Sequence, residues 1–177
     1  MSERQGYWQR RLDAVTSPCI FCSTIGDGMQ QSHSCCPHMG RSGIQLISKP
    51  LQVHLQGVLS HGGNTFHMFR SFCNIKTGTN VAIHSWLAVL ENQLQSNGKL
   101  PDTIYHQIDG GSENANLATI AVAELLVYRG LTKKVVLTRL PVGHTHEDID
   151  ARFGVRAADK LAITNLLFIQ LISDSTS

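Results

Sequence analysis

The sequence predicts an α/β domain in which a mixed sheet of about five strands is covered by helices. Three observations support this prediction. The chain has 177 residues and is 42% hydrophobic, which is enough for one domain with a substantial core. Two alternating runs around a Gly-rich turn predict a β-hairpin within residues 51–72. After residue 80, helical and strand patterns alternate, and this order requires parallel strands with right-handed crossovers.

The first half of the chain contributes one strand and the hairpin. The apolar run PCIFCSTI is followed by Gly-Asp-Gly, which predicts a buried strand that ends in a turn. The hairpin alternates apolar and polar residues on both sides of His-Gly-Gly-Asn. The predicted ranges are an N-terminal extension over 1–16, a strand over 18–25, a polar loop over 29–43, and hairpin strands over 51–60 and 65–72.

The second half contributes three helices and two strands. Apolar residues recur at helical spacing after Asn80, and Gly98 is a natural helix stop. Thr145 followed by Asp148 resembles a capping box at the start of the last helix. The predicted ranges are a helix from 80 to the stop at 98, a strand over 102–108, a helix over 116–130, a strand over 133–140, and a last helix from 145 through 153 that extends to 161 at most. We expect one core over 17–162, and the tail over 163–177 gives no clear pattern.

The composition excludes some partners and leaves others open. Only 16% of the residues are charged and the net charge is +2, so neither a polybasic arm nor an acidic tail dominates the surface. The apolar runs are too short for a membrane span, and the start of the chain does not resemble a signal peptide. We therefore expect a soluble intracellular protein without a membrane partner. Five cysteines in such a chain favour reduced thiols or metal ligation.

Carboxylates follow the predicted strands. Asp27 comes at the end of the first strand and Asp109 at the end of the fourth, and ligands of open α/β sheets bind at such carboxyl ends. A third group begins the helix after the last strand and consists of Glu147, Asp148 and Asp150. If the first, fourth and fifth strands are neighbours, all three groups lie at one edge. An all-oxygen set of this kind suits Mg²⁺ or Mn²⁺, and a two-ion site could drive phosphodiester chemistry.

Three motifs resemble a known superfamily. They are DGMQQ (27–31), QIDGGSENAN (107–116) and VGHTHEDID (142–150). Together with the element order they resemble an uncharacterised integrase-like domain family of transposon-derived eukaryotic proteins, and the ribonuclease-H-like core of DDE transposases and integrases. The resemblance implies a ribonuclease-H-like fold, a nuclear location, DNA as the partner, and cleavage or strand transfer that depends on Mg²⁺ or Mn²⁺. An oligomer is possible.

The resemblance also implies roles for individual residues. The catalytic acids would be Asp27, Asp109 and one acid of the last motif, where Asp148 is favoured over Asp150 and Glu147 remains a metal-ligand candidate. Site neighbours would be Asn114, Asn116, His144 and His146.

Ordinary structural interpretations exist for the same acids. Gly-Asp-Gly is turn chemistry by itself, and Asp109 before two glycines could simply end a strand. Acids at the start of a helix stabilise its dipole, although this effect does not explain the histidines His144 and His146 in front of them.

Two competing functions follow from the sequence. The first is an inactive, domesticated module that binds nucleic acid or protein without cutting. The second is a structural zinc domain with ligands from Cys19, Cys22, His33, Cys35, Cys36 and His38. Its spacing is close to that of a zinc finger but not equal to it, and two cysteines three apart on one strand point to opposite faces. We therefore favour free buried cysteines, a core role for Trp86, and packed or surface positions for His54, His67, His84 and His106.

Overall fold

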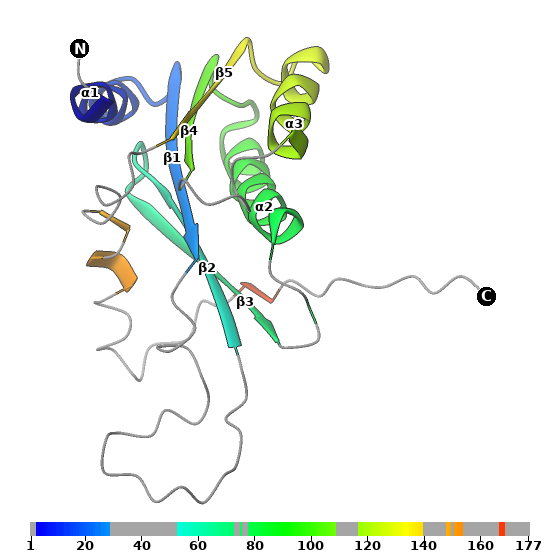
Figure 1. The fold of residues 1–177 in the computed structure, drawn as a ribbon. Helices are drawn as coiled ribbons and strands as arrows, with labels where there is room; N and C mark the ends of the chain where they lie inside the picture. Colours follow the sequence, from blue (N-terminus) through cyan, green and yellow to red (C-terminus); the bar gives the residue numbers. More distant parts are fainter. Residues whose placement is uncertain are drawn as a thin grey trace, which may run out of the picture.

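The computed structural model describes residues 3–28, 53–72, 75, 78–108, 117–139, 148–149, 151–153 and 167–168. Five long strands and one two-residue strand form an open sheet in the order β5-β4-β1-β2-β3-β6. Helices cover both faces of this sheet, so the architecture has three layers (Figure 1). The predicted α/β class with a mixed sheet of about five strands is therefore confirmed.

Strand β1 (Phe21–Gly28) lies at the centre of the sheet, with a neighbour of each orientation. It pairs antiparallel with β2 (Val53–Ser60) and parallel with β4 (Thr103–Ile108). The hairpin continues through the turn at 61–64 into β3 (Thr65–Phe72), as the Gly-rich signal predicts. The two-residue strand β6 (Leu167–Phe168) pairs parallel with β3 and forms the edge of the sheet on the hairpin side.

The second half of the chain supplies the parallel part of the sheet. Helix α2 (Thr79–Asn97) ends at Gly98, whose φ of 73° is accessible to glycine at little cost. Strand β4 is followed by α3 (Leu117–Tyr128) and then by β5 (Lys134–Arg139), which pairs parallel with β4. These elements agree with the predicted ranges to within one or two residues at each end.

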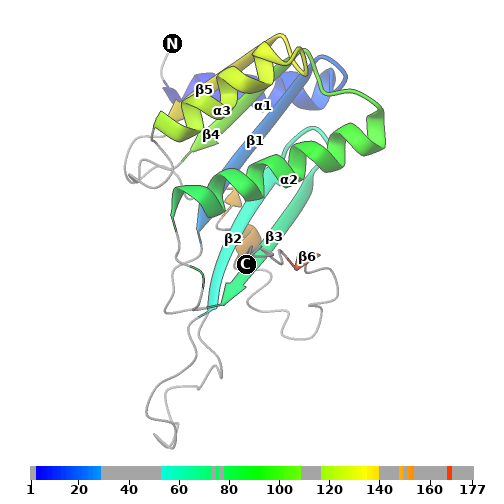
Figure 2. The same cartoon turned by 90° about the vertical axis from the view of Figure 1, so that its right-hand side faces the viewer.

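Apolar side chains pack on both faces of β1. On one face, α2 and α3 cover a cluster that includes Cys22, Trp86 and Ile104. On the other face, Ile149 and Phe153 cover Ile25 together with Leu59 of β2. Figure 2 shows α2 and α3 in front of the sheet and α1 behind it. Residues two apart on β1 share a face, so the side chains of Ser23, Ile25 and Asp27 belong to the face of α1.

In the N-terminal region, the structure adds a helix within the predicted extension and shifts the first strand. Residues 1–16, interpreted as an extension, contain helix α1 (Glu3–Thr16), which packs on β1. The first strand spans 21–28 and not 18–25, so Cys19 lies in the preceding turn and Asp27 lies within the strand. The strand extends to residue 28 because its pairing with β2 continues through Gly28.

The predicted last helix is seen only in part. Residues 149 and 151–153 are helical, and both Ile149 and Phe153 are buried. Apart from Asp148, the other residues in the range from 145 to 161 lie outside the described residues.

Candidate functional site

The carboxyl end of β1 carries Asp27, the first predicted metal ligand. Its backbone pairs with Gly57 of β2, and its carboxylate accepts a hydrogen bond of 2.7 Å from the backbone N–H of Gly28. The residue is half-buried, on the face that also carries Ile25. The chain therefore places a carboxylate at the end of the central strand, where α/β sheets bind ligands.

Strand β4 ends beside the same point of β1. In the parallel register Gly26 faces Ile108, the last residue of β4. The next residue in the sequence is Asp109, which lies outside the described residues. The order β5-β4-β1 makes the first, fourth and fifth strands neighbours, and this is the arrangement on which the predicted convergence of acids depends.

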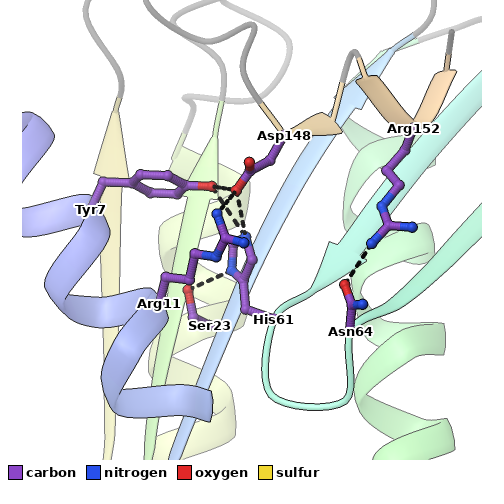
Figure 3. A network of polar contacts seen from close by, with 7 residues as sticks. All are labelled: Tyr7, Arg11, Ser23, His61, Asn64, Asp148 and Arg152. Carbon is purple, nitrogen blue, oxygen red and sulfur yellow. Dashed lines mark hydrogen bonds and ion pairs between the residues drawn. The ribbon is translucent and has the colours of Figure 1, made fainter.

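The other end of β1 carries a second polar cluster, and Asp148 belongs to it (Figure 3). One carboxylate oxygen, Oδ2, accepts a hydrogen bond of 2.7 Å from the Tyr7 hydroxyl and one of 2.8 Å from Nη1 of Arg11. The side chain of Asp148 is only 19% exposed. Tyr7 and Arg11 both come from α1, so this carboxylate joins the N-terminal helix to the chain after β5.

His61 lies beneath this carboxylate in the hairpin turn. Its Nδ1 is 3.0 Å from Oγ of Ser23, and its Nε2 is 3.1 Å from the Tyr7 oxygen. A neutral ring with its proton on Nε2 satisfies both contacts, because Nδ1 then accepts from the Ser23 hydroxyl. Desolvation lowers the pKa of His61, and the nearby Asp148 carboxylate only partly opposes this effect. The histidine is therefore neutral at pH 7.

Ser23, His61 and Asp148 have the residue types of a hydrolase triad, but their environment is that of a structural network. Ser23 is 3% exposed and His61 is 5% exposed. A nucleophile must be within reach of its substrate, and this hydroxyl is buried on the central strand on the side that α1 covers. We therefore interpret this group as a structural network that holds α1 against the sheet. We call it the α1 latch, and it consists of Tyr7, Arg11, Ser23, His61 and Asp148.

The two polar ends of β1 are well separated. Ser23 and Asp27 are four residues apart on one strand, which corresponds to about 13 Å between their Cα atoms. Asp148 lies at the Ser23 end, so the structure does not bring its carboxylate to Asp27. The following residues lie over the hairpin, because the Arg152 guanidinium donates to Oδ1 of Asn64 at 2.6 Å and a Cβ built on Gly57 would be 2.7 Å from Cζ of Phe153.

Most of the other predicted site residues lie outside the described residues. They are Asp109, Asn114, Asn116, His144, His146, Glu147 and Asp150. Within the part of the chain that the structure describes, no three His, Cys, Asp or Glu side chains form a group that could hold a metal ion.

The cysteine pair of the zinc alternative is only partly placed. Cys19 is exposed in the turn before β1, whereas Cys22 is buried and its thiol donates to Oε1 of Gln93 at 3.3 Å. Burial raises the pKa of the Cys22 thiol, so this group stays protonated and is a poor metal ligand. The other proposed zinc ligands, His33, Cys35, Cys36 and His38, lie outside the described residues.

A buried histidine of β4, His106, lies on the face of the sheet that α2 covers and has a structural role. The ring of His106 stacks on Trp86 at 4.2 Å, and its Nδ1 is 2.9 Å from Oγ1 of Thr24. Complete burial lowers the pKa of His106 to about 3. The core position of Trp86 and the packed position of His106 agree with the sequence prediction.

Sequence reasoning missed three partners of Asp148, namely Tyr7, Arg11 and His61. A weak signal was present, because Tyr7, Arg11 and Ala14 recur at helical spacing and therefore share one face of a helix. The pairing itself joins positions 137 residues apart, and no local pattern reveals such a pair.

None of the helices that the structure describes is long and apolar enough to cross a membrane.

Comparison with known proteins places the chain in a family. No curated protein sequence matches the chain. A family model described as a domain of unknown function (DUF7869) matches residues 46–175, a range that begins after α1 and β1 and includes Asp109 and the 147–150 acids. Because this match covers well over half of the 177 residues, the chain belongs to the DUF7869 family.

Proposed function

We propose that this chain is a ribonuclease-H-like core of the transposase and integrase type, which cleaves or transfers phosphodiester strands of DNA with Mg²⁺ or Mn²⁺. The observation that carries the proposal is the order of the sheet around Asp27. Strand β1 lies between an antiparallel hairpin and the parallel strands β4 and β5, and Asp27 is at its carboxyl end. Asp109 follows the last residue of the adjacent strand in the sequence.

The donor set suits hard divalent cations. Asp27 and Asp109 offer carboxylate oxygens, which Mg²⁺ and Mn²⁺ prefer over nitrogen or sulfur. The chemistry that such cations supply when bound is activation of water and neutralisation of charge on the leaving oxygen. The protein residues would hold the ions and position the scissile phosphate.

Asp148 does not fit the role of third ligand. Its Oδ2 is bound by a guanidinium and a phenol, and it lies at the opposite end of β1 from Asp27. Glu147 and Asp150 remain as candidates from the same motif. We favour Asp150, because the ring of Phe153, three residues further on, lies beside Gly57, the partner of Asp27 in β2.

The proposal is tested by nicking of supercoiled plasmid in Mn²⁺ by the wild type and by Asp27→Asn and Asp109→Asn. We expect cleavage by the wild type and at least a hundredfold loss in each variant, because oxygen ligands that neutralise the ions are removed. Asp102→Asn is the matched control. Asp102 is an acid of similar exposure before the amino end of β4, paired with Lys133 at 2.8 Å, and its loss should leave cleavage unchanged.

A second candidate function is a binding module that keeps the fold without the chemistry. The observation that favours it is the α1 latch, in which an acid of the most specific motif serves packing instead of metal binding. Wild type that neither binds Mn²⁺ nor nicks DNA, but retards a DNA duplex in a gel, would support this module and contradict the nuclease.

A further inference from the structure

Two polar side chains lie next to each other on the α1 side of the sheet, near the carboxyl end of β1. The parallel registers pair Ile25 of β1 with Gln107 of β4, and Gln107 with Thr138 of β5. Gln107 lies on the α1 side because the preceding residue, His106, stacks on a side chain of α2. Thr138 lies on the same side, because Leu137 packs in the cluster that α2 and α3 cover.

Gln107 and Thr138 each bury a polar atom that has no hydrogen-bond partner among the described residues. Gln107 is 4% exposed, and the atoms concerned are its Nε2 and Oγ1 of Thr138. The two atoms do not bond each other, although the residues are neighbours in the sheet. A buried donor without an acceptor costs stability, so apolar side chains would suit a purely structural position better. Such groups indicate a role beyond packing.

The Asp27 carboxylate is within reach of Gln107. Asp27 follows Ile25 by two residues on β1, so it lies on the same face and diagonal to Gln107. Neighbouring strands are about 4.8 Å apart and two residues span about 6.6 Å, so the two Cα atoms are about 8 Å apart. A side chain as long as glutamine can span this diagonal. Gln107 therefore lies one step behind the proposed metal ligand.

The chemistry of an amide fits a supporting role for a metal ligand. A carboxylate that binds a cation is itself usually hydrogen-bonded by protein donors, which fix its orientation. The N–H of an amide can donate to such a carboxylate, and the oxygen of the same amide can accept from a neighbouring hydroxyl. Thr138, Gln107 and Asp27 can therefore form one chain of hydrogen bonds across three adjacent strands.

We propose that Gln107 is a positioning residue, whose Nε2 donates to the Asp27 carboxylate when a divalent cation is held there. Thr138 supports it, because its hydroxyl donates to Oε1 of Gln107 and so determines which end of the amide faces Asp27. This inference rests on the proposed metal site and extends it by two residues. Gln107 contacts neither the cation nor the DNA, because it is buried.

The test compares two properties of Gln107→Met and Thr138→Val, namely the urea midpoint in EDTA and the calorimetric affinity for Mn²⁺. Both changes roughly keep the shape of the side chain and remove the unpaired atom, so we expect a midpoint at or above that of the wild type. The Mn²⁺ dissociation constant of Gln107→Met should rise about tenfold, and that of Thr138→Val should rise less. A merely structural role would instead give a lower midpoint and an unchanged affinity.

Ser85→Ala is the matched control. Ser85 is fully buried on α2, on the opposite face of the sheet, and its hydroxyl also has no partner within the part of the chain that the structure describes. Its replacement should leave the Mn²⁺ affinity unchanged, whatever happens to the midpoint.

Two results would overturn the proposal, and they differ in what they leave standing. If Gln107→Met binds Mn²⁺ as tightly as the wild type while Asp27→Asn binds it more weakly, the metal site remains and Gln107 has no part in it. If the wild type binds no Mn²⁺, the metal site and the role of Gln107 fail together.

Discussion

The two ends of strand β1 each carry an aspartate but differ in how its carboxylate is held. At the amino end, Asp148 accepts two short hydrogen bonds, including one from the Arg11 guanidinium, and is mostly buried. At the carboxyl end, Asp27 is half-buried and accepts from the backbone of its own neighbour, Gly28. The charge-assisted bond from Arg11 makes Asp148 a stabilising group, and the carboxyl end of β1, where Asp27 lies, is where α/β sheets bind ligands.

The acids that the transposase-type motifs group together therefore differ in their surroundings. From the VGHTHEDID motif we expected Asp148 to lie beside Asp27. Asp148 instead belongs to the α1 latch at Ser23, and about 13 Å separates the Cα atoms of Ser23 and Asp27. Among the predicted ligands, Asp27 lies at the carboxyl end of β1, Asp109 follows the last residue of β4 in the sequence, and Asp148 lies at the other end of β1.

The largest expected difference between the two ends is in stability. Asp148→Ala leaves Arg11 and the Tyr7 hydroxyl without their acceptor, and we expect a loss of about 2–3 kcal/mol in the free energy of unfolding. Asp27→Ala should cost about 1 kcal/mol, which is the net contribution of a hydrogen bond such as the one that Asp27 accepts from the Gly28 N–H. Urea unfolding of both variants measures the comparison. Equal losses for the two variants would mean that Asp148 has no special structural role.

The stability of the fold should also depend on pH, because two histidines are buried. The pKa of His106 is lowered to about 3 and that of His61 is also lowered by burial, whereas both are near 6.5 in the unfolded chain. Between these values the unfolded state binds more protons, so stability falls as pH drops from about 6.5 toward about 3. Each depressed histidine contributes at most about 1.4 kcal/mol per pH unit.

The measurement is the urea midpoint of the wild type and of His106→Gln at several pH values in that window. The variant cannot take up a proton at this position, so its stability should depend less steeply on pH, whatever its absolute level. A variant with the slope of the wild type would show that His106 is not the buried neutral group described above.

Much of the fold could be predicted from the sequence, because local patterns determine those elements. The stripe around Trp86 with a stop at Gly98 defines α2, and the Gly-rich turn at 61–64 defines the hairpin. The start of β1 was misplaced by three residues because Cys19 and Ile20 are apolar like the strand, although both are exposed. Local hydrophobicity cannot show where pairing with β2 and β4 begins.

Helix α1 and the α1 latch could not be predicted for a different reason. The buried face of α1 depends on Tyr7 and Ala14, so its apolar pattern is weak. Its stability comes from tertiary contacts with His61 and Asp148, which are far away in the sequence. The strand order that brings β4 beside Asp27 is likewise a property of the whole sheet, and no single segment encodes it.

We propose that the carboxyl end of β1 binds Mg²⁺ or Mn²⁺, and we infer that the α1 latch at the amino end stabilises the fold. The most direct measurement is calorimetric titration of Mn²⁺ into the wild type, Asp27→Asn and Asp148→Asn, each first shown to be folded by circular dichroism. We expect binding by the wild type and by Asp148→Asn, and at least a tenfold weaker affinity in Asp27→Asn. Loss of binding in Asp148→Asn with full binding in Asp27→Asn would contradict this assignment of the two ends.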